Sequence, residues 1–237
     1  MNVELTPAYV LHQRPFRETS VLLDIFSKQF GRVSLIAKGV RKNKRNQNGL
    51  LQLYQPLLVS WMGRGDLQTL TSVEVDKPRY ILQSQSALCG LYINELVVKL
   101  LPMHIAEPSV FDAYEQILER LQQADDIEVA LRLFEKCLLM HLGYGLVLDQ
   151  EVETGATIEH EQRYQYRPDS GLYRCVNQLD KPSISGRSLQ HLLMERDFDK
   201  QSLSEVKQMM RSVIHFYLGG KPLRSRQLFA SMKQYSN

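Results

Sequence analysis

The chain has 237 residues, 43% hydrophobic and 23% charged, with a formal net charge of +3 at pH 7. This length and apolar content can bury the core of one large domain or two small ones, which excludes an intrinsically disordered chain. The mean hydropathy is -0.28 and no apolar run approaches the ~20 residues that cross a bilayer, so a membrane-spanning protein is excluded too. The N-terminal residues MNVELTPAYVL include Glu4 and show no basic segment followed by a long apolar run, so we expect no secretory signal and a cytoplasmic protein.

The three cysteines, Cys89, Cys137 and Cys175, are widely separated and form no Cys-x-x-Cys pair. This spacing argues against a disulfide scaffold and against a zinc site made of four thiolates. We expect buried, reduced thiols that act as small hydrophobic side chains.

The charges are unevenly distributed along the chain. Residues 25–65 contain eight of the 29 bases and none of the 26 acids, which leaves the rest of the chain with a net charge of -5. Residues 107–170 hold 14 acids against five bases, whereas residues 181–237 hold ten bases against four acids. This asymmetry indicates a surface that binds a polyanion such as nucleic acid.

Residues 1–80 predict a small β domain, because short β-branched and aliphatic runs alternate with glycine-bearing turns. The expected strands are Ala8–His12, Ser20–Phe26, Arg32–Ala37, Pro56–Met62 and Leu67–Val75. A long basic loop separates the third strand from the fourth. Five short strands are typical of the OB-fold barrel, although a five-stranded open sheet or an SH3-like barrel would give the same pattern.

Residues 81–237 predict a mostly helical second domain with a small hairpin near 162–177, so the expected class is α+β with two domains. The expected helices are Ser84–Leu101, Ser109–Gln123, Asp126–Leu142 and one that begins at a Ser202–Glu205 capping box and ends at Gly219 and Gly220.

Known catalytic and phosphate-binding motifs are absent from the sequence: there is no GxGxxG, GxxxxGK[ST], HExxH or GxSxG. We therefore expect no enzyme, no cofactor and no metal. Basic side chains at 38, 41, 42, 44 and 45 can contact successive phosphates, and Phe16, Phe30, Tyr54 and Trp61 offer rings for base stacking. A place in the barrel core is the better interpretation of each ring.

Five strings in register resemble the RecO family of bacterial recombination mediators in its gamma-proteobacterial form. They are VLHQRPFRETSVLLDIFS, GRVSLIAKGVRK, GLYINEL, HLGYG and YLGGKPLRSRQLF. The resemblance covers residues 8–229 and implies an N-terminal OB-fold followed by a helical domain. It also implies binding and annealing of single- and double-stranded DNA without a cofactor. RecR and the acidic C-terminal tail of single-stranded-DNA-binding protein are the implied partners in loading RecA, and a part for RecF is left open.

Many RecO proteins carry a four-cysteine zinc module after the HLGYG string, but residues 146–176 contain a single cysteine, Cys175. We therefore predict no zinc in this chain. The expected hairpin would keep the position of the module, held by its tyrosines.

The resemblance assigns DNA binding to the basic residues of the barrel, which are Arg14, Arg32, Lys38, Arg41, Lys42, Lys44 and Arg45. Near the C-terminus, Lys221, Arg224 and Arg226 would either extend this DNA track or cap the last helix. For the partner tail, we expect an apolar pocket beside a cation, and the candidates are Leu131, Arg132 and Phe134. An ion pair of Arg132 with Glu128 or Glu135 is the alternative.

Two other functions remain open at this point. An OB-fold RNA-binding or translation-associated protein would carry the same basic stretch. A nuclease would need clustered carboxylates that hold Mg²⁺, and the acid-free residues 25–65 argue against it.

Overall fold

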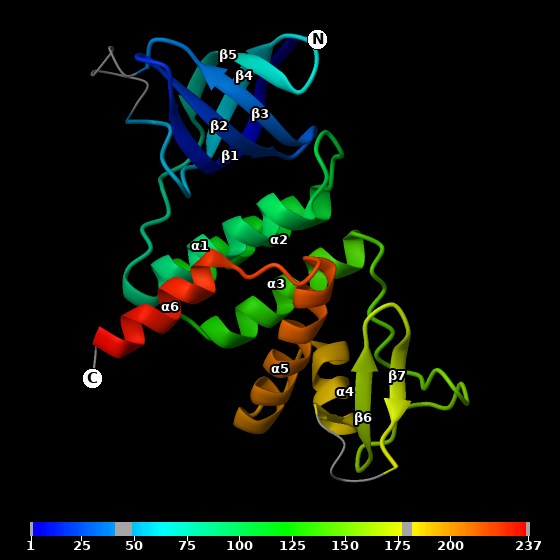
Figure 1. The fold of residues 1–237 in the computed structure, drawn as a ribbon. Helices are drawn as coiled ribbons and strands as arrows, with labels where there is room; N and C mark the ends of the chain where they lie inside the picture. Colours follow the sequence, from blue (N-terminus) through cyan, green and yellow to red (C-terminus); the bar gives the residue numbers. More distant parts are fainter. Residues whose placement is uncertain (1, 41–48, 177–181, 236–237) are drawn as a thin grey trace. The chain divides into compact units, whose positions relative to one another are not determined.

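A closed five-stranded barrel forms the N-terminal part of the computed structural model, which describes residues 2–40, 49–176 and 182–235 (Figure 1). Its strands are β1 (Asn2–Phe16), β2 (Ser20–Ser27), β3 (Gly31–Ala37), β4 (Leu57–Met62) and β5 (Leu67–Val75). The order β1-β2-β3-β5-β4 closes through β1 and β4, and only the β3–β5 pair is parallel. The predicted OB-fold is confirmed, and the open sheet is excluded.

The barrel closes because β1 is long enough to pair with two strands. Its first half pairs with β4 and its second half with β2, and the register shifts twice, between Val3 and Thr6 and between Val10 and His12. Such irregularities bend a strand and increase its twist, which lets one strand serve both sides of the closure. The interior is filled by alternate side chains such as Val10, Leu35 and Trp61.

The barrel shares a compact unit, here called the barrel unit, with α1 (Ser84–Leu100), α2 (Pro108–Gln123) and α6 (Arg224–Tyr235). Tyr9 and Phe26 on the strands pack against Phe111 and Tyr114 on α2, with ring centroids 5.1 to 6.0 Å apart. The Tyr9 hydroxyl also donates to a Glu115 carboxylate oxygen at 2.7 Å. Large buried rings in tilted and edge-on contact therefore join the helices to the barrel.

A buried hydrogen-bonded pair, Asn94 and Tyr114, sets the orientation of the helices in this packing. Asn94 on α1 is 4% exposed, and its side-chain amide donates to the Leu11 carbonyl of β1 at 3.0 Å. The amide oxygen accepts a bond of 2.6 Å from the Tyr114 hydroxyl. Because both partners would be left unsatisfied in any other register, this pair fixes how α1 and α2 lie on β1.

One carboxylate of α1 holds the C-terminal helix α6. Glu95 accepts bonds from the backbone N–H groups of Arg224 and Ser225, at 2.9 Å each, and from the Ser225 hydroxyl at 2.7 Å. It caps the exposed N–H groups at the start of α6, where the helix dipole favours a negative charge. Sequence patterns do not predict α6, because its N-terminal cap is a residue 129 positions away.

Residues 126–222 form the second compact unit, here called the hairpin unit. It contains α3 (Ile127–His141), β6 (Arg163–Arg167), β7 (Gly171–Arg174), β8 (Ile184–Ser185), α4 (Gly186–Met194) and α5 (Lys200–Tyr217). The expected hairpin is present as β6 and β7, and β8 adds a third strand in the order β7-β6-β8. The structural units thus place α1 and α2 with the barrel, and the proposed division between residues 80 and 81 stays a prediction.

The expected capping box of Ser202 and Glu205 is wrong. Helix α5 begins three residues earlier than that box would allow, and Asp199 and Ser202 form the capping box instead. Glu205 accepts bonds from the Ser185 backbone and hydroxyl, the Ser188 hydroxyl and the Arg163 guanidinium, at 2.7 to 3.0 Å. Burial alone would raise the pKa of Glu205, but these donors outweigh it and lower the pKa to about 2.

We expect Glu205→Gln to destabilise the hairpin unit in a pH-dependent way. Because the pKa of Glu205 falls from 4.5 to about 2 on folding, its charge stabilises the fold above pH 4.5 and loses that effect as the pH drops toward 2. The variant should lose up to about 3 kcal/mol at pH 7 and converge with the parent at low pH. Urea unfolding followed by far-ultraviolet circular dichroism at several pH values measures this. Glu161→Gln, at an exposed position, is the control. If the free energy of unfolding of Glu205→Gln depends on pH in the same way as that of the parent, the stabilising role of the Glu205 charge is contradicted.

A second prediction concerns Gly31, at the start of β3. Its φ is +65°, and a Cβ built there would lie 1.9 Å from the carbonyl oxygen of Ile105. Gly39 has a φ of +73°, but a Cβ built there meets no described atom within 4 Å, so Gly39→Ala should cost about 1 kcal/mol from backbone strain alone. Gly31→Ala adds a backbone clash and should cost at least about 3 kcal/mol. The fluorescence of Trp61, the single tryptophan, reports unfolding of this unit. An equal loss in the free energy of unfolding for Gly31→Ala and Gly39→Ala would refute the clash with the Ile105 carbonyl.

Candidate nucleic-acid interface

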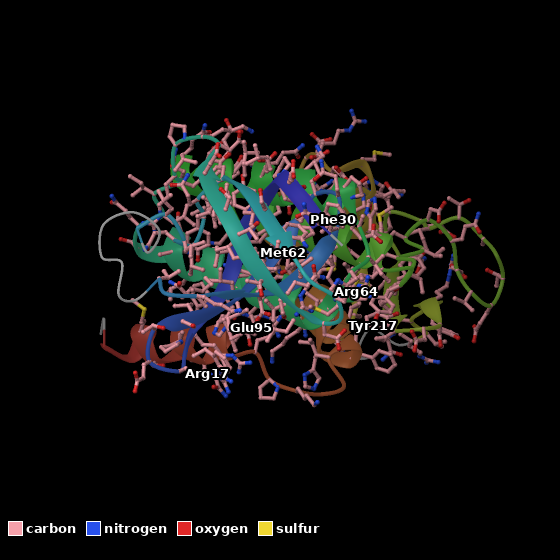
Figure 2. The ribbon with its side chains drawn as sticks, turned by 90° about the horizontal axis from the view of Figure 1, so that it is seen from above. Arg17, Phe30, Met62, Arg64, Glu95 and Tyr217 are labelled. Atoms are coloured by element: carbon pink, nitrogen blue, oxygen red, sulfur yellow. The ribbon has the colours of Figure 1, made fainter. Side chains whose placement is uncertain are left out.

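Two turns of the barrel carry exposed cations. In an OB-fold, the β1–β2 and β4–β5 loops flank the face that binds oligonucleotides. Arg17 lies in the first turn with its guanidinium 5.3 Å from the Phe16 ring centroid, and Arg64 lies in the second; both are labelled in Figure 2. Arg14 is exposed near the end of β1, and Lys38 is exposed just after β3. These four cations form the described part of the candidate interface.

Arg32 differs from the other predicted DNA contacts. Its side chain is half-buried, and its Nη1 donates to the Leu101 carbonyl at 2.7 Å, while its own carbonyl accepts from the His104 N–H at 2.9 Å. Burial lowers the pKa of this guanidinium. Arg32 therefore links β3 to the segment after α1, and a DNA contact by this residue stays a prediction. The other predicted residues of the basic loop, Arg41, Lys42, Lys44 and Arg45, lie outside the described residues.

The aromatic side chains of the barrel divide into two kinds. Trp61 is fully buried in the barrel core, which confirms the core interpretation for it. Tyr54 is also buried, at 6% exposed, but the end of its ring lies beside Gly90 of α1. Phe16 and Phe30 are partly exposed, and Phe30 meets Trp61 edge-on with centroids 5.3 Å apart. Sequence reasoning did not single out Arg17, because Glu18 follows it and it lies outside the acid-free stretch.

The C-terminal basic residues lie in different units. Arg224 is exposed and Arg226 half-buried on α6 of the barrel unit, and the Arg226 guanidinium lies 5.7 Å from the Tyr92 ring centroid. Lys221 is exposed at the end of the hairpin unit, where its backbone N–H donates to the Leu218 carbonyl. Their role in DNA binding stays a prediction.

The candidate cation for the partner tail, Arg132, is buried on α3. It is 5% exposed, and its Nη2 donates to Glu135 at 2.7 Å, which confirms the alternative ion pair with Glu135. Its Nε and Nη1 make no hydrogen bond within the described part of the chain. Leu131 beside it is half-buried and Phe134 is buried. Such unused guanidinium donors carry a desolvation cost that an incoming carboxylate would remove.

Further cations gather around Glu128 on the same helix. Its carboxylate accepts a bond from Lys207 on α5, and this bond, with the positive charges of Arg132 and Arg211, lowers the pKa of Glu128 although burial opposes the effect. Sequence reasoning missed Lys207 and Arg211 because they are about 80 residues from Glu128 along the chain and lie near it only through the packing of α5 on α3. We call the group formed by Glu128, Arg132, Lys207 and Arg211 the α3–α5 face. Its three cations exceed the two carboxylates they surround, Glu128 and Glu135, by one charge.

Metal ligands are not grouped in residues 2–40, 49–176 and 182–235, where no three His, Cys, Asp or Glu side chains could hold an ion together. The expectation of three buried thiols holds for Cys89 but is wrong for Cys137 and Cys175, which are half-exposed. No helix in the described ranges is long and apolar enough to cross a membrane.

Comparison with known proteins matches both halves of the chain. Residues 1–79 match the family model "Recombination protein O N terminal", and residues 83–227 match "Recombination protein O C terminal". The DNA repair protein RecO of Nitrosococcus oceani is 42% identical over an alignment of 238 positions, which covers all of this chain and 97% of the relative. The RecO proteins of Methylococcus capsulatus (43% identity; 97% of this chain and 94% of the relative) and Coxiella burnetii (41%; 95% and 97%) agree. The chain therefore belongs to the recombination protein O family.

Proposed function

We propose that this chain is a non-enzymatic recombination mediator of the cytoplasm. It binds and anneals DNA strands and, with RecR, loads RecA onto DNA coated by single-stranded-DNA-binding protein. The observation that carries the proposal is the family match over nearly the whole chain. The OB topology of the barrel and the exposed cations in its β1–β2 and β4–β5 turns support it.

Annealing follows from how such a surface holds a strand. Two complementary strands repel each other through their phosphates, and cations on the barrel offset this repulsion. Contacts to phosphates position a strand without reading its sequence, so the base edges stay available for pairing. Arg14, Arg17, Lys38 and Arg64 suit this role, because all four side chains are exposed.

Recruitment to coated DNA would use the α3–α5 face. A peptide that ends in acidic residues and a phenylalanine needs an apolar contact for the ring and a cation for the terminal carboxylate. Among the residues that the structure describes, two donor atoms of Arg132 have no hydrogen-bond partner, and Lys207 and Arg211 add positive charge near Glu128. The peptide's carboxylate would take the unused donors of Arg132, while Lys207 and Arg211 attract its acidic residues.

We expect binding to single-stranded DNA to depend strongly on salt. If the basic loop and its neighbours neutralise about five phosphates, the slope of log K against log salt should be about -3.5, or roughly a hundredfold in affinity between about 50 and 200 mM. Replacing Arg41, Lys42, Lys44 and Arg45 together by Ala should flatten the slope by about 0.7 per lost contact. Fluorescence anisotropy with a labelled oligonucleotide measures both.

The charge-conserving pair Arg41→Lys and Arg45→Lys is the matched control, because it should leave the slope unchanged. A slope near zero in the parent protein contradicts the electrostatic account. A matched RNA strand tests the alternative, since only a site that contacts the 2'-hydroxyl should prefer RNA.

Arg132→Ala should weaken binding of the tail peptide about ten- to a hundredfold, because it removes a charge-assisted hydrogen bond. Binding of naked DNA should hardly change. Because the substitution leaves Glu135 buried without its guanidinium, thermal melting is measured beside peptide anisotropy. Arg211 is exposed, so Arg211→Ala tests the same face without disturbing the buried Arg132–Glu135 pair. It should weaken peptide binding severalfold. Unchanged peptide affinity in both variants places the tail site elsewhere.

A further inference from the structure

The hairpin unit carries an aromatic cluster that neither the tail site nor the barrel uses. Tyr144, in the turn after α3, stacks on Tyr217 at the end of α5, with ring centroids 3.8 Å apart and planes inclined by 17°. Phe216 meets Tyr217 edge-on at 5.3 Å. Tyr144 and Tyr217 are half-exposed, and 48% of Phe216 is exposed. Three rings at the surface in one cluster exceed what a helix end needs for its own packing.

The cluster is held in place by the hairpin. The Tyr217 hydroxyl (Figure 2) donates a hydrogen bond of 2.8 Å to the Asp169 carboxylate. Asp169 lies in the turn between β6 and β7. Burial and this bond raise the pKa of Tyr217 to about 12, so the hydroxyl remains a donor to Asp169 even at mildly alkaline pH. A stacked, anchored ring has little conformational entropy left to lose when another flat group binds.

The surroundings of the rings favour a polyanion. Residues 206–222, the end of the hairpin unit, contain no Asp or Glu but three cations, Lys207, Arg211 and Lys221. Within the hairpin unit, exposed His215 and Lys221 lie next to the rings along the chain. One acid in contact with the rings, Asp169, already accepts a hydrogen bond from the Tyr217 hydroxyl. Flat rings beside cations are the combination that binds single strands, with bases on the rings and phosphates on the cations.

We propose that Tyr144, Phe216 and Tyr217 form a stacking platform for unpaired bases of single-stranded DNA, with Lys221 at the adjacent phosphate. The platform rests on the proposed DNA binding and adds a second contact site in the hairpin unit. It differs from the barrel in chemistry: the barrel cations hold phosphates, whereas this site holds bases. It therefore selects single strands, because a duplex keeps its bases stacked inside.

Photocrosslinking locates the bases. The intact protein is bound to an oligothymidylate in which some thymines are replaced by 5-iodouracil, a base that crosslinks to stacked aromatic rings on irradiation. Mass spectrometry should find crosslinked peptides that contain Tyr144 or residues 216–217. Adducts restricted to residues of the barrel unit overturn the platform while leaving DNA binding intact. No binding of the oligonucleotide at all refutes the proposed function itself.

Affinity measurements separate stacking from charge. Phe216→Ala and Tyr144→Leu should each weaken oligothymidylate binding about five- to tenfold, at the low end of the range for one stacked base. The salt slope should stay unchanged, because a neutral ring releases no counterions. Tyr144→Phe keeps the ring and is the matched control. Phe216 is exposed enough for its loss to spare the fold, so unchanged affinity in Phe216→Ala and Tyr144→Leu overturns the proposal.

Discussion

The packing of Tyr9 and Phe26 against Phe111 and Tyr114 decides how the barrel unit is built. These rings cover one side of the barrel with α2, and Asn94 ties the same side to α1 through the Leu11 carbonyl. A small barrel alone has a limited core, and large aromatic side chains add the apolar area it lacks. The turns that carry Arg17 and Arg64 are exposed to solvent.

The parts of the fold that follow from local patterns could be predicted from the sequence. Alternating apolar residues located all five strands, although β1 extends from Asn2 to Phe16 and so exceeds its apolar run. Its ends are strand because they pair with β4 and β2, which no local pattern reveals. Helix α6 and the role of Glu205 were missed for the same reason: their partners are distant in sequence.

The candidate sites were predicted unevenly. Charge composition pointed to Lys38, and the family resemblance to Arg14, and both side chains are exposed. Composition cannot tell a solvated guanidinium from one like that of Arg32, which donates to a carbonyl inside the unit. The ion pair of Arg132 with Glu135 followed from helical spacing, since side chains three apart share a face. Lys207 and Arg211 could not be found this way, because their proximity to Glu128 depends on how α5 packs on α3.

The position of α6 has a consequence for how the protein is made. The chain leaves the barrel unit after residue 125 and returns to it at residue 223, so the hairpin unit is an insertion whose two ends are both anchored. During synthesis the barrel strands emerge first, whereas the helix that Glu95 caps emerges only after the whole hairpin unit. The barrel unit thus cannot complete its structure until the hairpin unit has been made, and removal of residues 224–235 would take a helix from the barrel unit while leaving the hairpin unit whole.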